Sequence, residues 1–347
     1  MLTRRKLLTS SLAAGLAASA GPVMAKGKAG EDLFWDDHCG WGYESADDIA
    51  YLDLWRAAGI RYLSINVGYD VVPWATTVHA IANYTKRIAA RPDTVLCATM
   101  AQVKKAWAAG KLAVTYDIEG MGALNGDLAM VEFYYRQGVR QMLIAYNLNN
   151  DAGGGCHDDD KGLSDFGRAV VSEMNRVGMV VDCAHSGARS GLEAMKLSTK
   201  PCIFSHANAR ALQDHERNIT DEQIKALAAT GGVIGVNGVG RYLGPGKESA
   251  EGMVAHIDYM AKLIGTEHIG IGLDADPSKG PDVDPAVAAK YWPARQYPDS
   301  TLKMEILTPS VFPEIARLLR AKGYKEEAVH GIMGGNFQRI ATQVWAS

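Results

Sequence analysis

The stretch LSDFGRAVVSEMNRVGMVVDCAH, residues 163–185, joins two kinds of pattern in one short segment. Its first part is amphipathic and ends at Gly178, a residue type that commonly stops a helix. Its second part, MVVDCAH, is a short apolar run that ends on His185. The segment therefore predicts a helix followed directly by a buried strand, with a polar side chain at the end of that strand.

The same unit recurs along the chain. Other helical patterns, such as SADDIAYLDLWRAAG, also end at glycine. Eight strands alternating with helices predict a parallel α/β sheet, and eight is the number that closes a (β/α)8 barrel of the TIM type. Because no internal repeat, linker or low-complexity segment interrupts this order, we expect a single barrel domain over residues 26–347. Besides 179–185, the predicted strands are residues 33–38, 60–66, 112–119, 139–146, 201–206, 233–237 and 268–274.

The first 25 residues stand apart from this pattern. Arg4 and Arg5 precede the moderately apolar stretch KLLTSSLAAGLAASA, which is too short for a stable membrane span, and VMA at 23–25 offers small residues for cleavage. A twin arginine in this setting predicts a Tat signal peptide and a periplasmic protein. A merely basic N-terminus is the alternative. No cysteine precedes Cys39 and the last residues are not an apolar tail, so we expect neither a membrane span nor a lipid anchor.

The net charge argues against one class of partner, and the number of cysteines indicates a free thiol. The formal charge is −3 for the full sequence and −6 without the three cationic residues of the leader. A mildly acidic surface argues against a nucleic-acid partner, which requires clustered lysine and arginine. The five cysteines form no CxxC pair, and an odd number in an oxidising compartment leaves at least one free thiol. We expect Cys97, Cys183 and Cys202, which lie in apolar runs, to be buried as small hydrophobes.

Every predicted strand ends on a polar residue. In a barrel of this type the carboxyl ends of the strands form the mouth that holds the active site, so these side chains are expected to converge. One polar strand end is most often a satisfied hydrogen-bonding residue, but eight in the same position favour a functional site. They are His38, Asn66, Glu119, Tyr146, His185, His206, Asn237 and Asp274.

Three of these residues are good ligands for a divalent metal. Glu119, His185 and His206 form a His₂Glu set, which is typical of catalytic zinc sites that leave one position open for water. Bound zinc lowers the pKa of that water towards neutrality and so supplies hydroxide as a nucleophile. Either histidine taken alone is more simply explained as a packed histidine, and only the set of three favours a metal.

Motifs along almost the whole chain resemble those of one known family, the membrane (renal-type) dipeptidases of peptidase family M19. The resemblance implies a two-metal barrel, usually with zinc, that cleaves dipeptides and often accepts a D-residue at the C-terminal side; it also suggests a homodimer. The matching segments are DDH (36–38), IEGMGAL (118–124), GVRQMLIAYN (138–147), residues 162–187, FSHANARAL (204–212), RNITDEQIKALAATGGVIGVN (217–237), HIDYMAKLIGTEHIGIGLDAD (256–276) and GGNFQRI (334–340).

The resemblance also implies roles for individual residues. Glu119 would bridge the two metals, and His185 and His206 would complete the second site. Arg210, in SHANAR, matches the arginine that pairs with the terminal carboxylate of the substrate, a task that suits a planar, permanently charged fork. Asp274 matches the carboxylate that moves protons between water and the leaving amine. The alternatives are a surface arginine for Arg210 and a helix-capping carboxylate for Asp274.

The chain departs from the family pattern at the first metal. The family motif Asp-x-His-x-Asp reads Asp36, Asp37, His38, Cys39, Gly40 here, so the first metal keeps only His38 and a share of Glu119. Asp36 is expected about 7 Å from His38 along the strand, too far for an easy substitute. In a regular strand Cys39 points to the opposite face and reaches the metal only if the chain bends at Gly40.

A second departure is Tyr146, where the family usually has a histidine that polarises the scissile carbonyl. Loss of such a donor typically lowers the rate by about 10²–10³, and a tyrosine hydroxyl could recover part of it.

The loop DAGGGCHDDDKG (151–162) follows Tyr146 and carries Cys156, His157 and Asp158–Asp160. A solvated acidic loop is the simpler interpretation. The alternative is that His157 or one of the aspartates replaces the missing metal ligand.

Three functions fit these observations. The first is a metal-dependent hydrolase that cleaves dipeptides, or a related amide with a free carboxylate, using one or two divalent ions and a weakened first site. The second is a family member recruited to another metal-assisted reaction on a peptide-like metabolite. The third is a non-catalytic protein that holds a carboxylate ligand. Residues 275–300 are expected to form either part of the pocket wall or a subunit contact.

Overall fold

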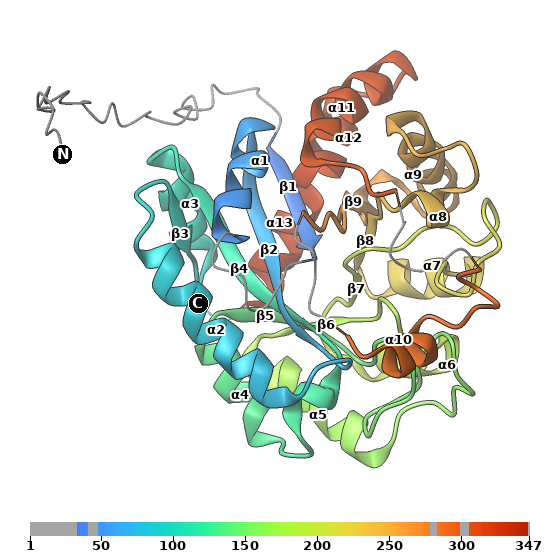
Figure 1. The fold of residues 1–347 in the computed structure, drawn as a ribbon. Helices are drawn as coiled ribbons and strands as arrows, with labels where there is room; N and C mark the ends of the chain where they lie inside the picture. The colour runs from blue at the N-terminus through green and yellow to red at the C-terminus, as the bar shows by residue number, and fades with distance from the viewer. Residues whose placement is uncertain (1–32, 41–47, 278–282, 299–304, 346–347) are drawn as a thin grey trace, which may run out of the picture.

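The computed structural model describes residues 33–40, 48–277, 283–298 and 305–345, so the predicted signal peptide lies outside the described residues. Eight parallel strands form a nearly closed barrel surrounded by helices (Figure 1), which confirms the predicted (β/α)8 fold class. Each of the eight predicted runs contains one strand. The strands are β1 (Phe34–Cys39), β2 (Ile60–Tyr69), β4 (Leu112–Glu119), β5 (Val139–Leu143), β6 (Val180–Asp182), β7 (Ile203–Phe204), β8 (Val233–Val236) and β9 (Ile269–Ile271).

Neighbouring strands pair in chain order from β1 to β9, with one addition. The short strand β3 (Thr94–Leu96) was not predicted; it pairs with the first residues of β4. The barrel closes where the chain continues past β9, because the backbone N–H of Asp274 donates to the carbonyl of His38 at 3.0 Å and Ala275 pairs with Cys39. The segment after β9 therefore lies directly beside the end of β1.

The helix predicted before Gly178 is present. It is α5, which is capped by the Ser164 hydroxyl, an acceptor for the N–H of Gly167, and which ends at Gly178 with φ 88°. Left-handed φ is a conformation that glycine adopts without strain. The α-helices are α1 (Leu52–Ala57), α2 (Trp74–Ala89), α3 (Met100–Ala108), α4 (Ala129–Arg136), α5 (Asp165–Val177), α6 (Ala188–Leu197), α7 (Asp221–Ala229), α8 (Gly240–Leu243), α9 (Ala250–Ile264), α10 (Pro285–Tyr291), α11 (Phe312–Ala321), α12 (Glu326–His330) and α13 (Asn336–Val344).

Four strands end earlier than predicted, and this matters for the site. β5, β6, β7 and β9 stop two to three residues before the polar residue that was expected to end them. After β6 the chain turns so sharply that His185 takes φ 57°, and after β9 Asp274 takes φ 59°. A left-handed backbone is costly for these residue types and is found mostly where the surroundings require it, often at functional sites. The irregular backbone turns both side chains towards the barrel mouth.

Candidate metal centre

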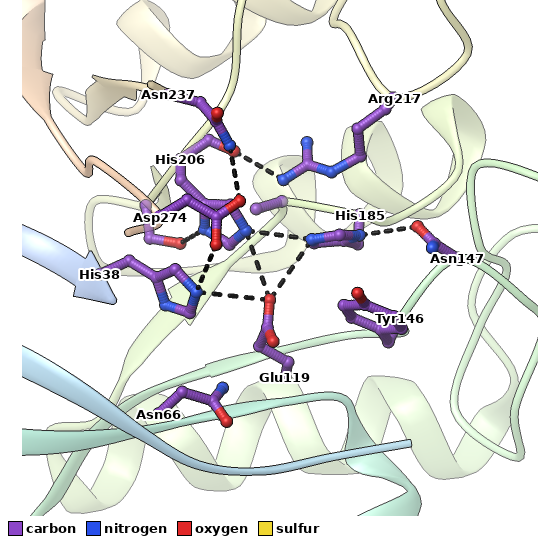
Figure 2. A network of polar contacts seen from close by, with 12 residues as sticks. His38, Asn66, Glu119, Tyr146, Asn147, His185, His206, Arg217, Asn237 and Asp274 are labelled. Atoms are coloured by element: carbon purple, nitrogen blue, oxygen red, sulfur yellow. Dashed lines mark hydrogen bonds and ion pairs between the residues drawn. The ribbon is translucent and has the colours of Figure 1, made fainter. Parts of the chain in front are cut away.

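Four side chains from different strands meet at one point at the mouth of the barrel (Figure 2). Oε1 of Glu119, at the end of β4, lies 3.3 Å from Nε2 of His185, 3.3 Å from Nε2 of His206 and 3.5 Å from Nε2 of His38. His38, Glu119 and His206 offer ligand atoms that all lie within 4.8 Å of one another. The structure thus brings Glu119, His185 and His206 together, and His38 joins them.

Neighbouring groups orient the imidazole rings as metal ligands. Nδ1 of His185 lies 2.7 Å from Oδ1 of Asn147. Because that amide oxygen only accepts, Nδ1 carries the proton and Nε2 turns a lone pair towards Glu119. Nδ1 of His206 lies 2.7 Å from the Ser205 hydroxyl, and the Nε2 atoms of the two histidines are 3.0 Å apart. Two imidazole nitrogens and a carboxylate oxygen this close together fit a shared cation.

His38 supports the same interpretation. Its ring is fully buried, and neither nitrogen makes a well-directed hydrogen bond, although Nδ1 lies 3.2 Å from Oδ1 of Asp117. Buried polar atoms are nearly always satisfied, so such a histidine requires a partner. A divalent ion at Nε2, with Asp117 accepting from Nδ1–H, would satisfy both ring nitrogens. The residues present therefore fit a metal.

Burial and neighbouring charges shift the pKa values of all four candidate metal ligands. Burial raises the pKa of Glu119 to about 8. Burial also lowers the pKa of His185 and His206 well below the ordinary histidine value, with Arg217 and His38 adding to the effect. Neutral imidazole is the form that binds metal. For His38, burial opposes the charged form, but the carboxylates of Asp117 and Glu119 outweigh it and raise the pKa well above the ordinary value.

Asp274 lies above this cluster. Its Oδ1 is 3.5 Å from Nε2 of His38, and its Oδ2 accepts a hydrogen bond from Nδ2 of Asn237 at 2.9 Å. The carboxylate is therefore held by one oxygen and offers the other to the cluster. Asn237, the polar end predicted for the β8 run, acts here by positioning Asp274.

Tyr146 packs against the cluster from the side. Its ring stacks on His185 with centroids 4.1 Å apart and contacts Tyr69 edge-on at 5.2 Å. Asp70 holds its backbone, because Oδ2 of Asp70 accepts from the N–H of Tyr146 at 3.0 Å. Burial raises the pKa of Tyr146 well above the ordinary tyrosine value, so its hydroxyl keeps its proton and can donate. Asp70 was not identified from the sequence because it follows β2 in a turn.

Most of the residues weighed as substitutes for the missing ligand are bound elsewhere, whereas Asp159 keeps an exposed carboxylate 3.7 Å from Nζ of Lys161. Asp36 accepts from Trp55 Nε1 at 2.7 Å and from the N–H of Leu273 at 2.8 Å, and the Cys39 thiol faces the carbonyl of Ser64 at 3.3 Å. Both ring nitrogens of His157 are engaged, with Glu216 at 2.8 Å and the Tyr297 hydroxyl at 3.0 Å. The aspartates of the same loop accept from nearby groups: Asp158 from the N–H groups of Asn149 and Asp159, and Asp160 from Ser190 and the N–H of Gly162.

Three arginines, Arg189, Arg210 and Arg217, line a cavity of about 310 Å³ that also contacts His185 and Cys156. Arg210, the residue predicted to hold the substrate carboxylate, lies at the rim with 41% of its side chain exposed and its Nε bonded to Asp214 at 2.8 Å. Arg217 lies deeper and is 2% exposed. Its Nη2 donates to the carbonyl of His206 at 2.7 Å, and its buried Nε has no hydrogen-bond partner among the described residues. Arg217 was not identified from the sequence, where only Arg210, seven residues earlier, was assigned to the substrate carboxylate.

Solved structures of other proteins share this fold. The chain is 28% identical to an amidohydrolase from Pseudomonas aeruginosa whose crystal structure superposes with a TM-score of 0.83, covering 92% of this chain and 98% of the other. A metallo peptidase from Rhodobacter sphaeroides, liganded with a phosphinate mimic of the dipeptide L-Ala-D-Ala, has the same fold at 19% identity, with a TM-score of 0.72 over 91% of this chain and all of the other. No helix of the described residues has the length and apolar character needed to cross a membrane.

Sequence relatives place the chain in a family. It is 31% identical over 240 residues to an uncharacterized dipeptidase of Schizosaccharomyces pombe, covering 67% of this chain but only 53% of that protein. It is 27% identical to a protein encoded in the pqqA 5′ region of Klebsiella pneumoniae, covering 72% of this chain and 89% of the relative. Residues 76–284 match the family described as membrane dipeptidase, peptidase family M19. The family match and the 31% identity to the Schizosaccharomyces pombe relative show that the chain belongs to the membrane dipeptidase family, peptidase family M19.

Proposed function

We propose that the protein is a zinc-dependent dipeptidase of the periplasm, which cleaves dipeptides or a related amide with a free carboxylate. One observation carries this proposal: three imidazole nitrogens surround a single oxygen of Glu119 within 3.5 Å, beside a cavity whose lining includes Arg210 and Arg217. Imidazole and carboxylate ligands suit zinc. Export rests on the twin arginine at residues 4 and 5.

The residues divide the work of hydrolysis. His38, Glu119, His185 and His206 would hold the metal, which when bound supplies polarisation of the scissile carbonyl and an activated water. Asp274 would take a proton from the attacking water on Oδ1, because Oδ2 is occupied by Asn237, and would return it to the leaving amine. The Tyr146 hydroxyl would donate to the developing oxyanion.

A panel of L,L- and L,D-dipeptides tests the proposal directly. With added zinc or manganese we expect hydrolysis of part of the panel, loss of that activity after dialysis against a chelator, and recovery when metal is returned. Amine release and bound metal per chain are measured on the same samples. Metal-loaded protein that turns over no dipeptide at any metal concentration would contradict the proposal and favour a carboxylate-binding protein.

Tyr146 favours a second candidate, in which the same centre acts on another peptide-like amide. Replacing Tyr146 by histidine is expected to raise kcat/KM for dipeptides about tenfold, because an imidazole supplies a stronger donor to the oxyanion and a phenol recovers only part of that stabilisation. The matched control Tyr146→Phe keeps the ring that stacks on His185 and removes only the hydroxyl, so we expect a loss of about tenfold. A folded, metal-loaded Tyr146→His variant with no gain would indicate that the natural reaction differs from dipeptide cleavage.

A further inference from the structure

The space beside Gly40 is occupied by another carboxylate. A Cβ atom at position 40 would lie 3.0 Å from Cβ of Asp276, 3.3 Å from its Cγ and 3.5 Å from its Oδ2. The first of these distances is shorter than ordinary carbon–carbon contact. The side chain of Asp276 therefore stands where a side chain at position 40 would extend, and Gly40 makes room for it.

The strand pairing explains how Asp276 reaches this place. Ala275 pairs in parallel with Cys39, and the N–H of Asp274 donates to the carbonyl of His38. This register places residue 276 next to residue 40 across the seam that closes the barrel. Asp276 is thus supplied from the segment after β9, while the position it fills belongs to β1.

Gly40 lies two residues after His38 and directly follows β1, so the Asp276 side chain beside it lies at the end of β1 from which His38 enters the mouth.

His38 shows that this side needs another ligand. Its buried Nε2 has no directed hydrogen bond and lies 3.5 Å from Oε1 of Glu119 and 3.5 Å from Oδ1 of Asp274. A catalytic zinc usually takes three protein ligands and keeps one position for water. Because Asp274 has the role of proton carrier in the proposed function, His38 and a shared Glu119 give two ligands, and one more carboxylate would complete the set.

We propose that Asp276 supplies the carboxylate that position 40 lacks and completes a first metal site with His38 and Glu119. The inference rests on the metal centre of the proposed function. It makes the chain a two-metal protein in which one ligand comes from the neighbouring strand end.

Metal stoichiometry tests this assignment without an activity readout. Protein is equilibrated with zinc by dialysis, and bound zinc per chain is measured by elemental analysis, with titration calorimetry for affinity and circular dichroism for folding. We expect two equivalents for the wild type and one for Asp276→Asn, with affinity for the weaker site reduced about 100-fold or more, since even an outer-shell partner contributes 10–100-fold. Asp151→Asn, which removes the same charge from an exposed loop residue, should keep two.

A ligand swap provides the second arm. Gly40→Asp with Asp276→Gly returns a carboxylate to β1 and removes the side chain that it would meet, so this double variant should regain two equivalents. Two equivalents in Asp276→Asn at unchanged affinity would overturn the inference and leave the proposed function standing, as would a single equivalent in the wild type. A wild type that binds no zinc would overturn both.

Discussion

Replacing Glu119 by glutamine is expected to abolish metal binding and lower kcat/KM for dipeptides by about 10³-fold or more, beyond the loss caused by removing one preorganised electrostatic group. Oε1 of Glu119 lies within 3.5 Å of Nε2 of His38, His185 and His206, so this single oxygen atom contacts all three imidazoles of the cluster. A glutamine has the same shape but no charge, and its nitrogen cannot accept. Bound zinc per chain and kcat/KM on the same samples measure the effect.

We expect the Glu119→Gln variant to fold. A loss of metal binding and activity can then be distinguished from a loss of structure. Burial raises the pKa of Glu119 to about 8, so the ionised side chain is costly in the metal-free protein and a neutral isostere is tolerated. We therefore expect the metal-free variant to unfold at a temperature no lower than that of the metal-free wild type. Zinc should raise the melting temperature of the wild type only, because binding to the folded state alone is stabilising. A variant that retained its zinc and its activity would show that Glu119 does not bridge.

The barrel could be predicted from the sequence because its signals are local. Each strand lies in a short apolar run and helices such as α5 end at a glycine, here Gly178, so the count of eight follows from the chain alone. The structure differs from the prediction where the presence or the end of a strand depends on pairing with another segment of the chain. β3 is three residues long and is a strand only because β4 lies beside it. β6 ends at Asp182, ahead of the predicted His185, because the chain there leaves the sheet.

The sequence identified only those candidate site residues that lie at the ends of the predicted strands. Polar residues at the ends of the predicted strands gave His38, Glu119, His185, His206 and Asp274, since parallel strands of a barrel end at one mouth. The residues that were missed lie in turns or in the loops after strands. Their positions depend on contacts between segments far apart in the chain, such as the pairing of Ala275 with Cys39 or the reach of Asp70 to Tyr146. Those residues are Asp70, Asn147, Arg217 and Asp276.

Arg217 is the second residue with a large expected effect. Replacing it by methionine is expected to raise KM and lower kcat/KM for dipeptides with a free carboxylate by about 30-fold or more, because loss of one partner of a buried charge pair costs about 2–5 kcal/mol. Arg217 is 2% exposed, lines the cavity beside His185 and has a buried Nε without a partner among the described residues. Steady-state kinetics on each dipeptide and on its C-terminal amide measure the effect, which should vanish for the amide.

Two controls decide between Arg217 and Arg210. Arg210→Met removes an exposed arginine paired with Asp214, an interaction worth about 0–1 kcal/mol, so kcat/KM should change less than about fivefold. Arg217→Lys keeps a donor for the carbonyl of His206 but loses the planar fork, and we expect partial loss with unchanged zinc content. If Arg210→Met instead gave the large, carboxylate-dependent loss while Arg217→Met did not, the substrate would bind at the cavity rim. The sequence prediction for Arg210 would then stand, and the unpaired Nε of Arg217 would have another role.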